Sequence, residues 1–114
     1  MNYIETSAEL LELIAAPAEK DKEVREIFKG ERRRILLISL RNGAVLTRHK
    51  APEPITVQCI SGSGTFTAGP DLEDSQKLVP GTFLTLDPDI EHEATAESEL
   101  HILVTRFIGD AVNG

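Results

Sequence analysis

This chain of 114 residues has little of what marks secreted or membrane-spanning proteins. It has one cysteine, so no disulfide can form within the chain, and a reducing compartment fits best. No run of eighteen apolar residues occurs, and the first residues lack the basic start and apolar stretch of a secretory signal. We therefore expect a cytoplasmic protein.

Positive charge is also scarce. The chain has 12 Lys and Arg against 19 Asp and Glu, which gives a formal net charge of −7 at pH 7. Such a chain repels DNA and anionic membrane surfaces on average. The three arginines at 32–34 stand without interleaved aromatic residues, so we interpret them as a solvated surface. We expect neither nucleic acid nor a membrane as a partner.

Motifs of common catalytic sites are missing as well. No serine or cysteine lies in a nucleophile elbow, and no glycine-rich phosphate loop precedes a helix. The sequence therefore predicts neither an esterase-type nucleophile nor a nucleotide site.

The N-terminal residues predict one short helix. Residues 6–9, Thr-Ser-Ala-Glu, have the form of a capping box, and an apolar stripe at helical spacing follows. Pro17 ends the pattern. We expect this helix to cover the outside of a sheet.

The rest of the chain consists of short apolar segments between turn signals, a pattern typical of strands. Residues 35–40 are apolar at both parities, which indicates a strand buried on two faces and a homodimer interface. Turns are expected at Asn42-Gly43, at 61–64, at Pro80-Gly81 and at 87–89. The expected strands are 24–28, 35–40, 45–50, 55–60, 65–68, 76–79, 82–86, 92–96 and 100–107.

This pattern predicts an all-β fold, an antiparallel barrel of the jelly-roll type with a short N-terminal helix. The length allows one domain. Within it we expect an N-terminal helix and edge segment at 1–32, the barrel at 33–108 and a tail at 109–114.

The segments around two histidines resemble the two sequence motifs of the cupins, small jelly-roll barrels also described as RmlC-like double-stranded β-helices. Gly43, His49 and Gly62 match the first cupin motif at its spacing. Gly81 and His92 match the second. The resemblance implies a barrel whose lumen is reached by His49 and His92.

The resemblance also implies a divalent metal, which cupins hold with two histidines and a glutamate of the first motif and one histidine of the second. Here Ala51 stands in place of the second histidine, and Ile55 stands in place of the glutamate. A catalytic metal needs about three protein ligands. A third ligand could come from His101 or from the thiolate of Cys59, whereas Gln58 and Glu93 would need a β-bulge to reach the lumen.

The first functional hypothesis is that the barrel binds a small organic molecule in its lumen. The walls would be mostly apolar, with two imidazoles to orient the ligand. The residues expected to line this site are Thr47, His49, Ala51, Ile55, Val57, Cys59, His92 and Ala94.

Two alternatives remain open. One is a metal-dependent enzyme of the dioxygenase or isomerase type, with Fe, Mn, Ni or Zn held by His49, His92 and His101. The other is a non-catalytic, dimeric structural or sensing protein in which the histidines are structural. Cys59 lies in an apolar segment, and its alternative interpretation is an inert buried thiol. The sequence decides neither whether the protein is an enzyme nor whether a metal is bound, and it names no substrate.

Overall fold

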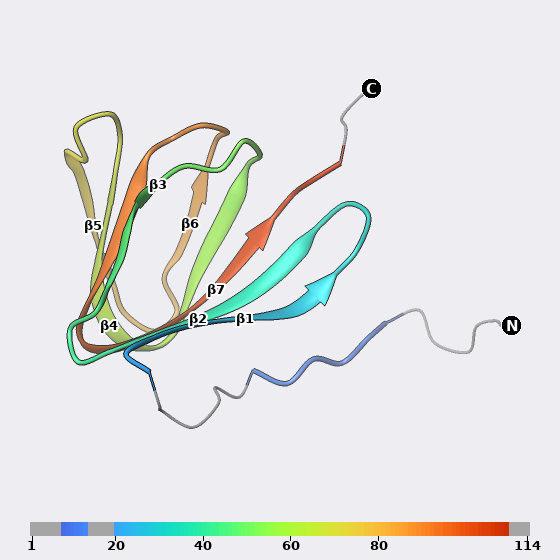
Figure 1. Cartoon of the computed structure of the whole chain (residues 1–114), viewed down its shortest axis with the longest axis horizontal. Helices are drawn as coiled ribbons and strands as arrows, with labels where there is room; N and C mark the ends of the chain where they lie inside the picture. The colour runs from blue at the N-terminus through green and yellow to red at the C-terminus, as the bar shows by residue number, and fades with distance from the viewer. Residues whose placement is uncertain (1–7, 14–19, 110–114) are drawn as a thin grey trace, which may run out of the picture.

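The computed structural model describes residues 8–13 and 20–109, and within them the chain forms a curled antiparallel sheet (Figure 1). The predicted all-β class is confirmed. The strands are β1 (Lys22–Lys29), β2 (Arg34–Arg41), β3 (Val45–His49), β4 (Ile55–Ala68), β5 (Asp74–Leu78), β6 (Phe83–Leu86) and β7 (His92–Arg106).

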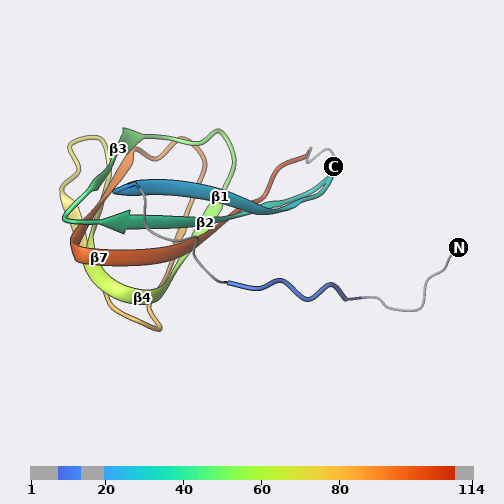
Figure 2. The ribbon, with the colours of Figure 1, turned by 60° about the horizontal axis from the view of Figure 1, so that its bottom comes forward.

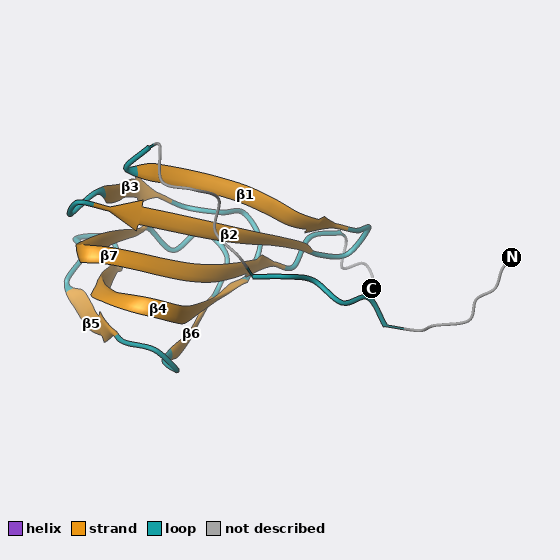
Figure 3. Ribbon diagram, turned by 90° about the horizontal axis from the view of Figure 1, so that it is seen from below, coloured by secondary structure: helices purple, strands orange, loops and turns teal. Residues whose placement is uncertain are grey.

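Two long strands, β4 and β7, pair with each other and turn the sheet into a barrel. The second half of β7 pairs with β2, whereas its first half pairs with β3. In the same way β4 pairs with β6 through its first residues and with β5 through its last. Each long strand therefore belongs to both walls of the barrel, as its curvature in Figure 2 shows. In Figure 3 the strands β1, β2, β7 and β4 lie side by side in one wall.

The turn predicted at residues 61–64 was wrong, because these residues lie inside β4. The register between β4 and β7 shifts there, and Gly62 faces Leu100 while Gly64 faces Ala96. Glycine at such a shift allows a bulge and a sharp bend within a strand. The segments 55–60 and 65–68 are thus one strand, and 92–96 and 100–107 are likewise joined in β7, which ends at Arg106.

The predicted N-terminal helix falls mainly outside the described residues. Its described part, residues 8–13, has no regular secondary structure. The edge strand expected at 24–28 is present as β1, which pairs with β2 at the end of the strand order. No helix in residues 8–13 or 20–109 is long and apolar enough to cross a membrane.

The core fills the space between the two walls and comes from alternate residues of the long strands. Most residues at even positions of β7 are buried, as are the residues at odd positions in the first part of β4, which is the alternation expected of strands. The buried cluster is Ile38, Leu40, Ile55, Val57, Cys59, Phe66, Leu78, Leu86, Ala94, Ala96, Leu100, Ile102 and Val104. This core leaves a cavity beside His92.

Candidate ligand site in the barrel lumen

Strand pairing brings the two motif histidines together. In the register between β3 and β7, His49 lies opposite His92. A register shift between Leu46 and His49 marks a β-bulge, and both of these side chains line the lumen. The two imidazole rings meet edge to face, with their centroids 4.2 Å apart.

Hydrogen bonds assign the nitrogens of both rings. The Nδ1 atom of His49 lies 2.8 Å from the carbonyl oxygen of Thr47, and Nδ1 of His92 lies 2.9 Å from that of Ile90. A carbonyl oxygen only accepts, so each Nδ1 carries a hydrogen and donates it. In the neutral rings the lone pairs therefore lie on the Nε2 atoms, which are 3.1 Å apart. Two lone pairs at this distance need one hydrogen between them or a bound group that both rings contact.

His92 is the buried member of the pair. It is 4% exposed and stacks on Phe66, with ring centroids 5.5 Å apart and an interplanar angle of 14°. Burial holds the pKa of His92 below its ordinary value, and the adjacent His49 lowers it further against the opposing effect of the Ile90 carbonyl. His49 is exposed. The pair thus joins a buried neutral base to a ring that solvent reaches.

A cavity of about 210 Å³ adjoins the histidine pair. For scale, a cavity of roughly 150 Å³ in another protein holds benzene, so this space suits one ring with a few substituents. Most of the lining is apolar. The lining residues are Leu36, Ile38, Leu46, His49, Lys50, Ala51, Pro52, Ile55, Val57, Phe66, His92, Ile102, Val104 and Arg106.

The structure brings some of the predicted site residues together and separates others. Those in the cavity lining are His49, Ala51, Ile55, Val57 and His92. Thr47 is exposed outside the cavity because the bulge breaks the alternation of β3, and only its carbonyl contacts the site. Ala94 is fully buried in the core beside His92 and does not line the cavity.

Cys59 lies on the same face of β4 as the lining residues, but its thiol does not reach the cavity. It is 1% exposed, and its Sγ lies 3.7 and 3.8 Å from the carbonyl oxygens of Ser61 and Gly62. Burial raises the pKa of the Cys59 thiol. Such a thiol is a poor ligand and a poor nucleophile, since both roles need the thiolate.

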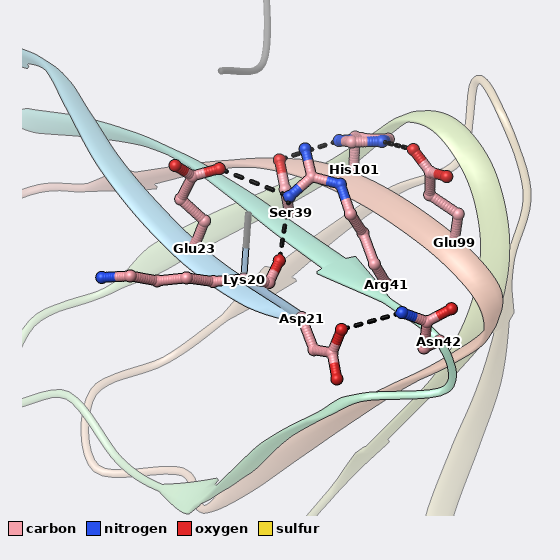
Figure 4. A network of polar contacts seen from close by, with 8 residues as sticks. All are labelled: Lys20, Asp21, Glu23, Ser39, Arg41, Asn42, Glu99 and His101. Carbon is pink, nitrogen blue, oxygen red and sulfur yellow. Dashed lines mark hydrogen bonds and ion pairs between the residues drawn. The ribbon is translucent and has the colours of Figure 1, made fainter. Parts of the chain in front are cut away.

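His101 lies away from the pair, on the opposite face of β7. Its neighbours Leu100 and Ile102 are buried in the core, so alternation turns the imidazole outward. There its Nδ1 lies 2.8 Å from the Ser39 hydroxyl and its Nε2 lies 2.6 Å from a carboxylate oxygen of Glu99, as Figure 4 shows. The structure therefore does not bring the third histidine to His49 and His92.

The sequence analysis did not identify much of the cavity lining, although the alternation of residues along β7 indicates some of it. Ile102, Val104 and Arg106 share the parity of His92 along β7, so their inward direction was available from the sequence. Strand β2 contributes Leu36 and Ile38 to the cavity lining, because it pairs with β7 next to Val104 and Ile102. The other missed residues, Leu46, Lys50, Pro52 and Phe66, depend on the bulge and on the pairing of distant strands.

An ion pair joins β7 to the loop between β3 and β4. The Nε and Nη2 atoms of Arg106 lie 2.8 and 2.7 Å from the same carboxylate oxygen of Glu53. A backbone hydrogen bond from the Phe107 amide to the Pro54 carbonyl, 3.0 Å long, joins the same two segments. The end of β7 is thus held against the loop that contributes Lys50, Ala51 and Pro52 to the cavity wall.

The donor set for a divalent metal is incomplete. Two Nε2 atoms converge, but within residues 8–13 and 20–109 no three His, Cys, Asp or Glu side chains gather in a group that could hold a metal. Two imidazoles alone bind a divalent ion too weakly to retain it against competing ligands. The described residues therefore do not fit the metal centre that the cupin motifs imply.

Comparison with family models gives no match for this chain, and comparison with curated proteins gives none either. Solved structures match its fold. An uncharacterised conserved protein with a double-stranded β-helix domain from Klebsiella pneumoniae subsp. pneumoniae MGH 78578 has a TM-score of 0.77 at 14% identity, over 92% of this chain and 94% of that one.

Two further solved structures are of cupin proteins. A cupin superfamily protein from Desulfitobacterium hafniense DCB-2 has a TM-score of 0.75 at 16% identity, over 92% of this chain and 94% of that one. An RmlC-like cupin family protein from Methanocaldococcus jannaschii has a TM-score of 0.73 at 16% identity, over 90% and 93%. The resemblance read from the two histidine motifs is confirmed at the level of the fold, and this chain is a double-stranded β-helix of the cupin type.

Proposed function

We propose that this chain binds a small organic molecule in the lumen of its barrel. The observation that carries the proposal is the convergence of two Nε2 lone pairs, 3.1 Å apart, at the wall of an apolar cavity of about 210 Å³. Apolar walls with a few convergent polar atoms are the usual composition of a ligand site. The apolar body of the ligand would lie against Ile55, Val57 and Ile102, and a polar group would contact the histidines.

The size of the cavity limits the ligand. Scaling from the cavity of roughly 150 Å³ that holds benzene gives a ligand of about eight or nine non-hydrogen atoms. The experiment is a thermal-shift screen of metabolites in this size range, followed by calorimetric titration of each compound that raises the unfolding temperature. A ligand that binds only the native state raises that temperature, and the stabilisation grows with the logarithm of the ratio of ligand concentration to dissociation constant.

Histidine variants make the screen specific for the lumen. We expect His49→Ala to weaken binding at least tenfold, because it removes one of the two converging nitrogens. His101→Ala is the matched control, since it removes a histidine from the outer face of β7. A lumen site would be contradicted if both variants weakened binding equally, or if neither variant changed the affinity.

A metal-dependent enzyme is the second candidate, and the same convergence of Nε2 atoms is the observation in its favour. The missing third ligand weighs against it. Elemental analysis of the untagged protein, as isolated and after incubation with Fe, Mn, Ni and Zn followed by desalting, separates the two candidates. About one metal per chain, lost in His92→Ala, would favour the enzyme, and we expect less than a tenth of that amount.

A further inference from the structure

The charges that line the cavity are opposite in sign to those of the whole chain. Lys50 and Arg106 contribute to the lining, and among residues 8–13 and 20–109 no carboxylate does. The chain itself carries a formal net charge of −7, so a cationic lining is not a consequence of composition. In a cleft with apolar walls, charges of one sign attract ligands of the other sign more strongly than they would in open solvent.

Arg106 is the cation that the structure holds in place. It continues the inward face of Ile102 and Val104 at the end of β7, and 31% of its side chain is exposed. Its Nε–H hydrogen bond and its Nη2 ion-pair contact go to a single oxygen of Glu53, whose side chain is 14% exposed. A guanidinium has five N–H hydrogens in a planar fork that matches a carboxylate. The hydrogen bond to Glu53 uses one of the five, the hydrogen on Nε.

We propose that the lumen selects small monocarboxylates with an apolar body, and that Arg106 binds the carboxylate in competition with Glu53. This inference rests on the proposed function. The ring or chain of the ligand occupies the apolar part of the cavity, and its carboxylate approaches the guanidinium at the cavity wall. A second carboxylate near Arg106 repels Glu53, so anion binding weakens the ion pair between β7 and the loop from β3 to β4.

This arrangement makes Glu53 a residue that lowers the affinity for anions. With glutamine at position 53, the guanidinium keeps a neutral hydrogen-bond acceptor but loses the competing charge. Arg48 provides a comparison elsewhere in the chain, because it forms an ion pair with Glu91 and lies outside the cavity lining. Arg48→Gln lowers the net charge of the protein by one, as Arg106→Gln does, at a residue outside the cavity lining.

The test uses benzoate and benzamide, which have one ring, nearly the same shape and different charge. Calorimetric titrations at pH 7 compare the wild type with Arg106→Gln, Glu53→Gln and Arg48→Gln. We expect the wild type to bind benzoate at least tenfold more tightly than benzamide, and Arg106→Gln to remove this preference. Glu53→Gln should tighten benzoate binding three- to tenfold without changing benzamide binding, and Arg48→Gln should change neither.

Equal affinities for the two probes in the wild type would overturn the inference, as would a preference that persists in Arg106→Gln. Failure of both probes to bind would overturn it too, because benzoate satisfies the proposed size and charge. If Arg106→Gln fails to fold, Glu53→Gln decides, since it retains the arginine. The proposed function stands or falls separately, through the metabolite screen and the loss of binding in His49→Ala.

Discussion

Ser39 and His101 lie opposite each other on β2 and β7, and the Ser39 hydroxyl is 2.8 Å from Nδ1 of His101. The Glu99 carboxylate, 2.6 Å from Nε2, accepts the hydrogen on that nitrogen, and in the neutral ring Nδ1 then accepts a hydrogen bond from the serine. The hydrogen bond from His101 also holds the pKa of Glu99 below its ordinary value. The third histidine therefore has both nitrogens engaged on the outer face, where alternation along β7 places it.

This chain of hydrogen bonds predicts a stability effect for Ser39→Ala. Ser39 is 3% exposed, and its loss leaves Nδ1 of His101 without its donor. We expect the free energy of unfolding in urea to fall by about 1 kcal/mol. Ser75→Ala, at an exposed position of β5, is the control and should stay within about 0.5 kcal/mol of the wild type. Equal stability of the two variants would contradict a buried bond at Ser39.

The pKa of His92 predicts how stability changes with pH. Burial lowers this pKa from its ordinary value of 6.5, so below that pH the unfolded chain binds a proton that the folded chain does not. The free energy of unfolding should therefore rise as the pH increases toward 6.5 and level off above it. The carboxylates with lowered pKa values, Glu91, Glu97 and Glu99, lose their contribution in a separate window, as the pH falls below 4.5.

Urea titrations at pH 5, 6, 7 and 8 measure this dependence. His92→Gln removes the titrating group and should flatten the slope between pH 5 and pH 7, whatever its effect on overall stability. His101→Gln is the control, because it removes a histidine outside the cavity. An unchanged slope in His92→Gln would show that another group dominates the pH dependence.

The sequence predicted the barrel because its strand and turn signals are local. Alternation in residues 55–59 and 100–104 identified the inward face of both long strands. It failed at residues 61–64, where glycine and serine are as typical of a tight turn as of a bulge. Only the pairing of β4 with β7 distinguishes these cases, and that pairing joins residues far apart in the chain.

The candidate site was predictable to the extent that it follows from motif spacing. His49 and His92 were identified in this way, and Ile55 and Val57 by their position on one strand. The separation of Thr47 from His49 was not predictable, since it depends on the bulge in β3. The ion pair of Arg106 with Glu53 joins two segments that no local pattern connects.

The homodimer remains a prediction. Substitution at the outer face of β2 tests it most directly. Leu37 there adjoins a hollow of about 110 Å³ to which Leu13 and Ile60 also contribute, and Leu13 is 41% exposed. We expect light scattering at micromolar concentration to give about twice the chain mass of 12.5 kDa. Leu13→Ser should shift the mass toward the monomer. A wild-type mass near that of one chain would contradict the prediction.

Two glycines with the same backbone handedness predict very different costs of substitution. Gly62 has φ +78°, and a Cβ there would lie 2.0 Å from the Glu99 carbonyl oxygen on β7. Gly81 has φ +94°, with no atom within 4 Å of such a Cβ. Alanine at 81 therefore adds only backbone strain, about 1–2 kcal/mol, whereas alanine at 62 must also separate the two long strands.

We expect the free energy of unfolding to fall by at least about 3 kcal/mol in Gly62→Ala, which is large for a single substitution. Urea denaturation of both variants measures the difference. If Gly62→Ala unfolds too readily for a full transition, hydrogen exchange of the amides in β7 near residue 100 replaces it. Costs that are equal at the two glycines would mean that β4 and β7 separate easily at their bend, and that backbone strain alone determines the cost of both substitutions.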